Sequence, residues 1–180
     1  VTSATSSEGK STTALTLARN FAQMGTRVLL IDADLRNPTL HRTLGIDNSR
    51  GLSSLLAGVA RPDDVIKPSG DPNLMVVTSG PLPSNPAELL AGSKMISLLT
   101  VAGVKFDRII IDGPPVLGLA DAPVLASVAR GTLLVVESSR TRVSTARNAI
   151  KRLFSAQAIM VGGVFTKYQS RNAGYGYGYG

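Results

Sequence analysis

The sequence contains no cysteine, which excludes disulfide bonds, thiol catalysis and cysteine-ligated zinc or iron–sulfur clusters. It has no tryptophan and only four phenylalanines, and its lysines and arginines are scattered along the chain. A nucleic-acid surface built on stacking needs aromatic residues among clustered positive charges, so we expect no nucleic-acid partner. No apolar run approaches the roughly 18 residues of a membrane-spanning helix, and no signal peptide is recognisable.

The chain has 180 residues, of which 43% are hydrophobic and 17% charged, and this predicts one ordered domain with a sizeable core. Its net charge of +7 serves solubility, or it attracts anionic groups such as lipid headgroups, nucleotides or nucleic acid. The chain opens on Val1, a strand-type residue, without an initiator methionine. We therefore expect a fragment of a longer protein, truncated within its first strand.

Short continuous apolar runs recur along the chain, at 28–31, 74–77, 108–111, 133–136 and 159–165. Such runs are typical of strands buried on both faces. Helical patterns lie between several of them, at 10–24, 93–101, 120–128 and 143–154. This alternation predicts an α/β fold with a mostly parallel sheet. Prolines and glycines punctuate 36–86, where we expect surface loops and short helices around one strand.

The residues from Ala4 to Ser11 read A-T-S-S-E-G-K-S and match the phosphate-loop pattern G-x-x-x-x-G-K-[ST], except that alanine replaces the first glycine. The loop follows a strand end and opens a helix, so its backbone N–H groups and the helix N-terminus can face one anion. Lys10 would reach the β- and γ-phosphates of ATP, and Ser11 would bind Mg²⁺. The predicted nucleotide-binding residues are Thr5, Ser6, Ser7, Glu8, Gly9, Lys10, Ser11 and Thr12.

Three carboxylates follow two of the predicted strands. Asp32 and Asp34 come directly after the run 28–31, and Asp112 follows the run 108–111. Ligands of open parallel sheets bind beyond the carboxyl ends of the strands, so all three acids should face the phosphate loop. Asp112 best fits the acid that holds Mg²⁺, with Asp34 near the metal and Asp32 as general base toward a hydroxyl; capping of the following turns is the alternative.

Arg36 follows these acids two residues after Asp34. A guanidinium there can pair with Asp34 or with a phosphate of the nucleotide, and both readings stay open.

Together, the loop at 4–11, the apolar-D-x-D-x-R segment at 28–36 and the apolar-D-x-x-P segment at 108–115 resemble the bacterial tyrosine kinases (BY-kinases) of exopolysaccharide and capsule synthesis. The segments 7–13, 34–38 and 85–90 strengthen the resemblance, which runs from Val1 to about Tyr168. It implies a P-loop NTPase-like three-layer fold of the MinD/ParA branch, with helices on both faces of the sheet. It also implies that Lys10, Asp32, Asp34 and Asp112 belong to the catalytic machinery.

The same resemblance implies partners and a location. Members of this family phosphorylate a C-terminal tyrosine cluster, often in trans within a ring-like homo-oligomer, and further protein substrates are expected as partners of this chain. They work with a membrane-embedded polysaccharide co-polymerase segment, in cis or in trans. The expected location is the cytoplasmic face of the bacterial inner membrane, with this fragment itself soluble.

All four tyrosines of the sequence lie in its last 13 residues. Three of them, Tyr175, Tyr177 and Tyr179, alternate with glycine, a composition that cannot bury a core and predicts a flexible tail over 169–180. We expect these three to be the phosphoacceptors, since glycine gives a tail the freedom to enter an active site. A low-complexity adhesive or linker segment is the alternative.

The predicted organisation is thus a kinase domain over 1–168 that uses ATP and Mg²⁺, followed by the tail. Two alternatives are a MinD/ParA-like ATPase switch without tyrosine transfer and a non-enzymatic binding module. Relatives that position cargo carry a second lysine where this chain has Thr5, which disfavours the switch. Relatives often have asparagine at the position of Thr166, so the adenine contacts remain undefined.

Overall fold

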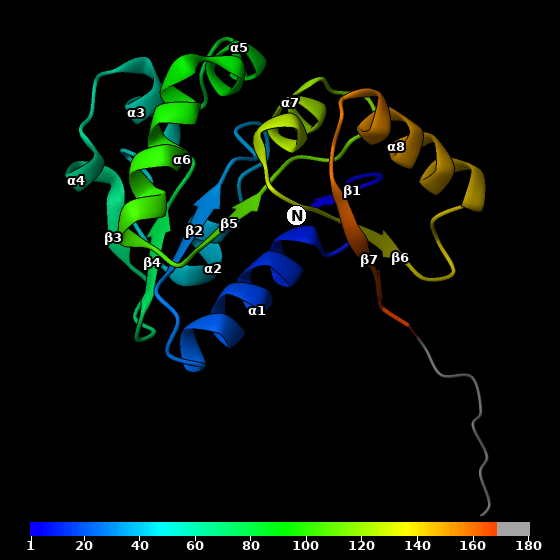
Figure 1. Ribbon diagram of the computed structural model, residues 1–180, viewed down its shortest axis with the longest axis horizontal. Coiled ribbons are helices and arrows are strands. Elements are labelled where there is room, and N and C mark those ends of the chain that lie inside the picture. The colour runs from blue at the N-terminus through cyan, green and yellow to red at the C-terminus, as the bar shows by residue number, and fades with distance from the viewer. Residues whose placement is uncertain (169–180) are drawn as a thin grey trace, which may run out of the picture.

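Strand β2 (Val28–Asp32) is buried at all five positions, because helices cover both faces of the sheet at this point. Leu29 and Ile31 point into one core cluster, and Val28 and Leu30 point into another. The computed structural model describes residues 1–168 and shows the sheet between two helical layers (Figure 1). This arrangement is the expected three-layer α/β fold.

The strands of the sheet form two hydrogen-bonded groups. One has the order β3-β4-β2-β5 and the other β1-β6-β7. The Gly113 N–H donates to the Val1 carbonyl oxygen at 2.9 Å and joins the two groups beside the phosphate loop. Apart from β2, the strands are β1 (Thr2–Ser3), β3 (Ile66–Pro68), β4 (Leu74–Val77), β5 (Arg108–Asp112), β6 (Thr132–Glu137) and β7 (Met160–Thr166).

All strand pairs are parallel except β3 with β4. The carboxyl ends of β1, β2, β5, β6 and β7 therefore lie along one edge of the sheet. The predicted strands are confirmed, whereas β3 was not expected within the irregular segment 36–86. Its three residues end in Pro68, and a proline is tolerated there because β3 is an edge strand.

One helical layer holds α1 (Lys10–Gln23) and α2 (Leu40–Leu44), whose apolar residues share a core cluster with Val28 and Leu30. The opposite layer holds α3 (Leu52–Ala57), α5 (Pro86–Ala91), α6 (Ser93–Lys105), α7 (Asp121–Val128) and α8 (Val143–Ser155). A short helix, α4 (Pro62–Val65), leads into β3. Among residues 1–168, none of these helices combines the length and hydropathy that crossing a bilayer requires.

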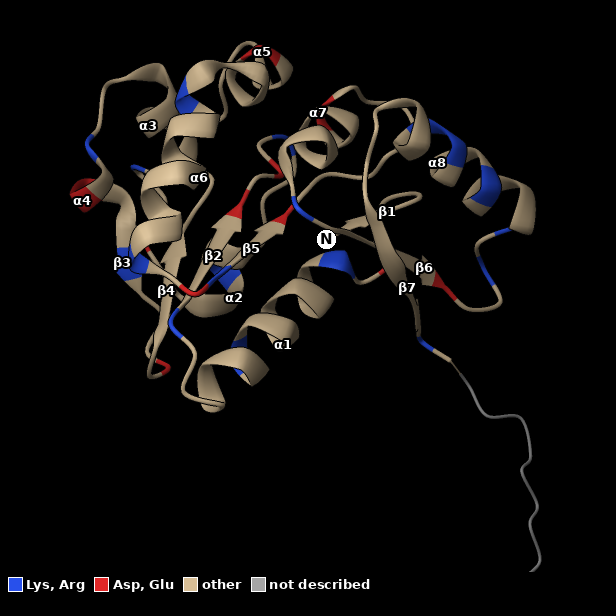
Figure 2. Cartoon of the chain, in the orientation of Figure 1, with Lys and Arg blue, Asp and Glu red and all other residues tan. Residues whose placement is uncertain are grey.

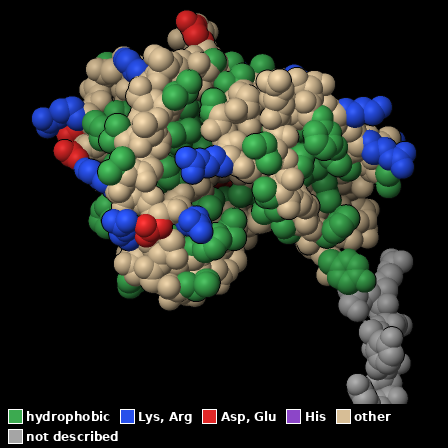
Figure 3. All heavy atoms as spheres, in the orientation of Figure 1, with side chains coloured by type: hydrophobic (Ala, Val, Ile, Leu, Met, Phe, Trp, Pro, Cys, Tyr) green, Lys and Arg blue, Asp and Glu red, His purple; other side chains and the backbone are tan. Residues whose placement is uncertain are grey.

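Basic side chains are spread across the surface. Figure 3 shows lysine and arginine at separate places over the visible face of the described residues, with apolar and polar side chains between them. The lysine and arginine side chains on this face therefore do not form one continuous patch.

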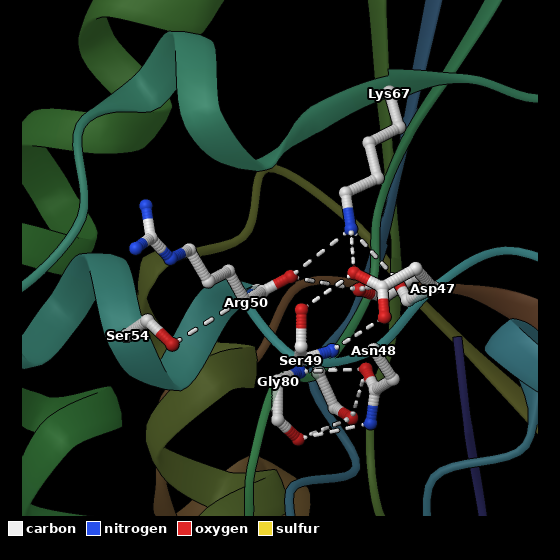
Figure 4. Close-up of polar contacts among 10 residues, drawn as sticks. Asp47, Asn48, Ser49, Arg50, Ser54, Lys67 and Gly80 are labelled. Carbon is white, nitrogen blue, oxygen red and sulfur yellow. Dashed lines mark hydrogen bonds and ion pairs between the residues drawn. The ribbon is translucent and has the colours of Figure 1, made fainter.

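The loop between α2 and α3 is pinned by a polar network (Figure 4). Asp47 accepts hydrogen bonds from Ser49 and forms an ion pair with Lys67, whose Nζ lies 3.1 Å from Asp47 Oδ2. These contacts lower the pKa of Asp47 to about 2. Asn48 accepts the Gly80 N–H at 2.9 Å. Gly51 then approaches the backbone after β4 so closely that an added Cβ would lie 2.2 Å from the Thr78 carbonyl oxygen.

This close approach predicts a large loss of stability for Gly51→Ala. The φ angle of Gly51 is −166°, which alanine adopts readily, so the loss comes from the steric clash alone. We expect about 3 kcal/mol lower free energy of unfolding, measured by urea denaturation. Gly103→Ala is the control, because a Cβ at this position in α6 meets nothing within 4 Å. That variant should gain roughly 0.5–1 kcal/mol from helix propensity, and equal effects of the two substitutions would contradict the steric explanation.

Candidate nucleotide site

The phosphate loop connects β1 to the first turn of α1, as its sequence predicts. Ser7 and Gly9 have left-handed φ angles of 65° and 88°, which bend the chain between strand and helix. A Cβ on Gly9 would lie 3.3 Å from Cγ2 of Thr166, so glycine is needed for both conformation and space. Ala4 is fully buried and lies outside the left-handed region, which explains why alanine can replace glycine at the start of the loop.

Lys10 opens α1, and its ammonium group meets two of the predicted acids. Its Nζ lies 2.8 Å from Oδ2 of Asp34 and 3.4 Å from Oδ1 of Asp112. The hydroxyl oxygen of Ser11 is 3.2 Å away. Figure 2 shows the acidic tips of β2 and β5 next to the basic start of α1. Three chain segments far apart in the sequence are thus brought together at one edge of the sheet.

Burial controls the protonation of these acids. Asp112 is fully buried, and burial raises its pKa. The pKa of Asp32 is raised to about 7, first by burial and then by the negative charge of Asp112. Asp32 is also enclosed by backbone donors, because its Oδ2 accepts the Leu40 N–H at 3.1 Å. Asp34 accepts the Asn37 N–H through Oδ1 at 3.0 Å and keeps Oδ2 for Lys10.

A cleft of about 870 Å³ lies beside these groups, within the size range of nucleotide-sized ligand sites. One wall is the phosphate loop with the start of α1, and the other runs from Asp34 to Thr43 through the start of α2. The predicted residues that line it are Ser6, Ser7, Gly9, Lys10, Ser11, Thr12 and Asp34. Thr5, Glu8, Asp32, Arg36 and Asp112 lie behind this surface or beside it.

Arg36 makes a contact that neither sequence-based reading anticipated. Its guanidinium binds Asp121 through two hydrogen bonds of 2.7 and 3.3 Å. Asp121 is 1% exposed and begins α7, so the ion pair ties the loop after β2 to the segment after β5. A contact of Arg36 with phosphate stays a prediction.

Sequence reasoning missed the groups that hold the phosphate loop from behind. The side chain of Glu8 is fully buried, accepts the Thr5 N–H at 2.6 Å, and also accepts the hydroxyl of Thr141. The Thr166 hydroxyl donates to the Glu8 carbonyl oxygen at 2.6 Å. Thr141 is 133 residues from Glu8 in the chain, and nothing in its local sequence marks it. For Thr166, the departure from asparagine was the only signal.

The residues present fit a magnesium ion that is shared with phosphate. Among residues 1–168, no group of three or more His, Asp or Glu side chains could hold a metal ion by itself. Asp112 Oδ2 is buried without a hydrogen-bond partner in this part of the chain, which leaves a carboxylate oxygen available for a cation. In nucleotide sites Mg²⁺ uses few protein ligands and completes its shell with phosphate oxygens and water. Ser11, Asp34 and Asp112 meet that requirement.

The chain is similar to a known nucleotide-binding family and to named kinases within it. Residues 1–175 match the model of the CobQ/CobB/MinD/ParA nucleotide binding domain. The chain is similar to tyrosine-protein kinase YwqD of Bacillus subtilis, with 43% identity over 98% of this chain and 75% of that protein. It is also similar to the putative tyrosine-protein kinase CapB of Staphylococcus aureus, with 35% identity over 100% of this chain and 79% of the relative.

Two solved structures have folds similar to that of this chain. The kinase domain of Escherichia coli tyrosine kinase ETK has a TM-score of 0.92 at 35% identity, covering 99% of this chain and 70% of that one. The Mg-ADP complex of Pyrococcus horikoshii MinD has a TM-score of 0.75 at 23% identity, over 93% of this chain and 68% of that one. This second likeness supports the fold alone.

The buried charge of Asp112 leads to a test of the site. Asp112→Asn keeps the shape of the side chain but takes one carboxylate partner from the buried ammonium group of Lys10, so the nucleotide-free variant should melt lower than the unaltered chain. The rise in melting temperature that ADP and Mg²⁺ produce together should largely disappear. Differential scanning fluorimetry measures both quantities.

Asp107→Asn is the matched control for this substitution. Asp107 directly precedes β5 and pairs with Arg27 on the surface, with Nη2 and Oδ1 2.7 Å apart. This variant should keep the full ligand-induced rise. An Asp112→Asn variant that also keeps it would show that this carboxylate does not take part in binding.

Proposed function

Because the chain belongs to the bacterial tyrosine-protein kinases, within the CobQ/CobB/MinD/ParA nucleotide-binding family, we propose that it transfers the γ-phosphoryl group of ATP to tyrosines of its own C-terminal segment. The observation that carries the proposal is the position of Lys10. Its ammonium group lies at a helix N-terminus, between carboxylates from two strand ends, and lines a cleft of about 870 Å³.

Phosphoryl transfer depends mainly on positioning and charge neutralisation. The loop N–H groups and Lys10 would hold the phosphate oxygens of ATP, and Ser11, Asp34 and Asp112 would hold Mg²⁺. When bound, this ion neutralises charge on the β- and γ-phosphate oxygens. A bond forms between the tyrosine oxygen and the γ-phosphorus while the bond to the bridging oxygen breaks, and ADP leaves.

The hydroxyl proton of the tyrosine needs an acceptor, and we propose that Asp32 takes this role. Asp34 lines the cleft, and Asp32 lies behind it, with Oδ1 of Asp32 accepting the Asp34 N–H at 3.3 Å. The pKa of Asp32, about 7, is close to the value that suits a general base near neutral pH.

The end of β7, after which the proposed acceptor segment begins in the sequence, lies beside the cleft. Lys167 follows β7 and donates to the Ser7 carbonyl oxygen at 3.0 Å, and Tyr168 is 73% exposed. The proposed acceptors Tyr175, Tyr177 and Tyr179 lie outside the described residues. We propose that they reach the cleft of this chain or of a second copy in a ring-like homo-oligomer, and that other protein substrates use the same cleft.

We also propose action in polysaccharide export at the cytoplasmic face of the inner membrane, with a membrane co-polymerase segment as partner. The chain covers 24% of the length of the putative tyrosine-protein kinase EpsB of Ralstonia solanacearum, at 38% identity. It also resembles the chimerical protein CapA2B2, with a TM-score of 0.88 at 33% identity over 91% of this chain and 73% of that one. Relatives thus occur both as short chains and as parts of much longer ones.

Incubation of the oligomerisation-competent protein with ATP and Mg²⁺ tests the activity. Mass spectrometry should find phosphate on Tyr175, Tyr177 or Tyr179, and Lys10→Met should lower the initial rate roughly 100-fold or more, because a cation that neutralises transferring charge is lost. Replacing the three tyrosines with phenylalanine should remove most of the label, whereas Tyr168→Phe should not.

A different result would contradict the kinase proposal. Absence of phosphotyrosine, together with ATP hydrolysis that does not change when residues 169–180 are deleted, would replace the kinase proposal with an ATPase switch.

A further inference from the structure

The phosphate loop contains a carboxylate that ought to oppose its function. Glu8 directly precedes Gly9 and Lys10, yet its side chain is fully buried and does not line the cleft. A negative charge facing the cleft would repel the phosphates that the loop collects. The loop therefore needs contacts that hold this carboxylate away from the ligand.

Two donors hold the Glu8 carboxylate. Oε2 accepts the Thr5 N–H at 2.6 Å, which closes the loop on itself, and Oε1 accepts the Thr141 hydroxyl. The Thr141 oxygen in turn accepts the Glu137 N–H at 3.2 Å, so its single proton is free for Glu8. The loop after β6 is thereby connected to the middle of the phosphate loop.

Two further donors fix the loop backbone. The Thr166 hydroxyl donates to the Glu8 carbonyl oxygen at 2.6 Å, and Lys167 Nζ donates to the Ser7 carbonyl oxygen at 3.0 Å. In a trans peptide the C=O and the N–H of the same unit point in opposite directions. These two hydrogen bonds hold the Glu8 and Ser7 carbonyls toward the end of β7 and therefore direct the N–H groups of Gly9 and Glu8 away from it.

We propose that Glu8 is a positioning residue that fastens the phosphate loop to the carboxyl ends of β6 and β7, with Thr141 and Thr166 as its anchors. The carboxylate does not touch the nucleotide, and it acts through the direction of the loop N–H groups. The inference rests on the proposed function, since it assumes that the loop binds nucleotide phosphate. It gives the end of β7, from which the acceptor segment departs, a part in nucleotide binding.

The test compares substitutions that differ by one hydroxyl. Thr141→Val removes the donor to Glu8 at nearly constant volume, and Thr141→Ser retains it. We expect the dissociation constant of a fluorescent ADP analogue with Mg²⁺ to rise about tenfold in Thr141→Val, which corresponds to about 1.4 kcal/mol. Thr141→Ser should stay within about twofold of the unaltered protein, because its donor is intact. Thr166→Val and Thr166→Ser should behave in the same way.

The role of the Glu8 side chain is tested directly. Glu8→Gln should retain affinity, because the amide oxygen can accept the Thr5 N–H while the amide N–H₂ donates to Thr141. Glu8→Ala should lose at least as much affinity as Thr141→Val. In kinase assays the KM for ATP should rise more than kcat falls, because the loss lies in binding the phosphates.

A control variant and its melting temperature distinguish a general loss of stability from a specific loss of nucleotide affinity. Thr100→Val removes a hydroxyl that, within residues 1–168, bonds only to the Ile96 carbonyl oxygen of its own helix, on the surface of α6. It should leave the dissociation constant unchanged, whatever its melting temperature. Unchanged affinity in Thr141→Val, or equal losses in Thr141→Val and Thr141→Ser, would overturn the inference. An unaltered protein that binds no nucleotide would instead overturn the proposed function.

Discussion

The site depends on one cation held between two strand ends. Lys10 is 8% exposed, and its ammonium group is stable there because Asp34 and Asp112 lie within 3.4 Å of it. The acids need the cation in return, since burial raises the pKa of Asp112. Buried charges persist only where they are paired, so the loop, β2 and β5 are fixed relative to one another by this contact.

Much of this arrangement follows from local sequence patterns. The apolar runs located five of the seven strands of the described residues, because a strand buried on both faces has a short continuous apolar run. The strand end before the phosphate loop located a sixth, β1. The loop pattern and the positions of the acids after the strands predicted that Lys10, Asp34 and Asp112 lie close together, because parallel strands end at one edge of the sheet. The strand β3 was not predictable, since a three-residue edge strand that ends in proline has almost no pattern.

The rest of the site could not be read from the sequence because it depends on contacts between distant segments. The partner of Arg36 proved to be Asp121, 85 residues away, where local reasoning offered only Asp34 or phosphate. The loop anchors Thr141 and Thr166 are single hydroxyl groups in segments without periodicity. The position of Asp32 at a strand end was predictable, but its enclosure behind Asp34 depends on how α2 packs.

The ion pair between Arg36 and Asp121 couples two loops of the site. It joins the loop that carries Asp34 to the first turn of α7, and its carboxylate is 1% exposed. Separating the two groups would leave a buried charge without a partner, which is strongly unfavourable. This contact therefore couples the two loops, and a rearrangement of the cleft wall that separates them has to break the ion pair first.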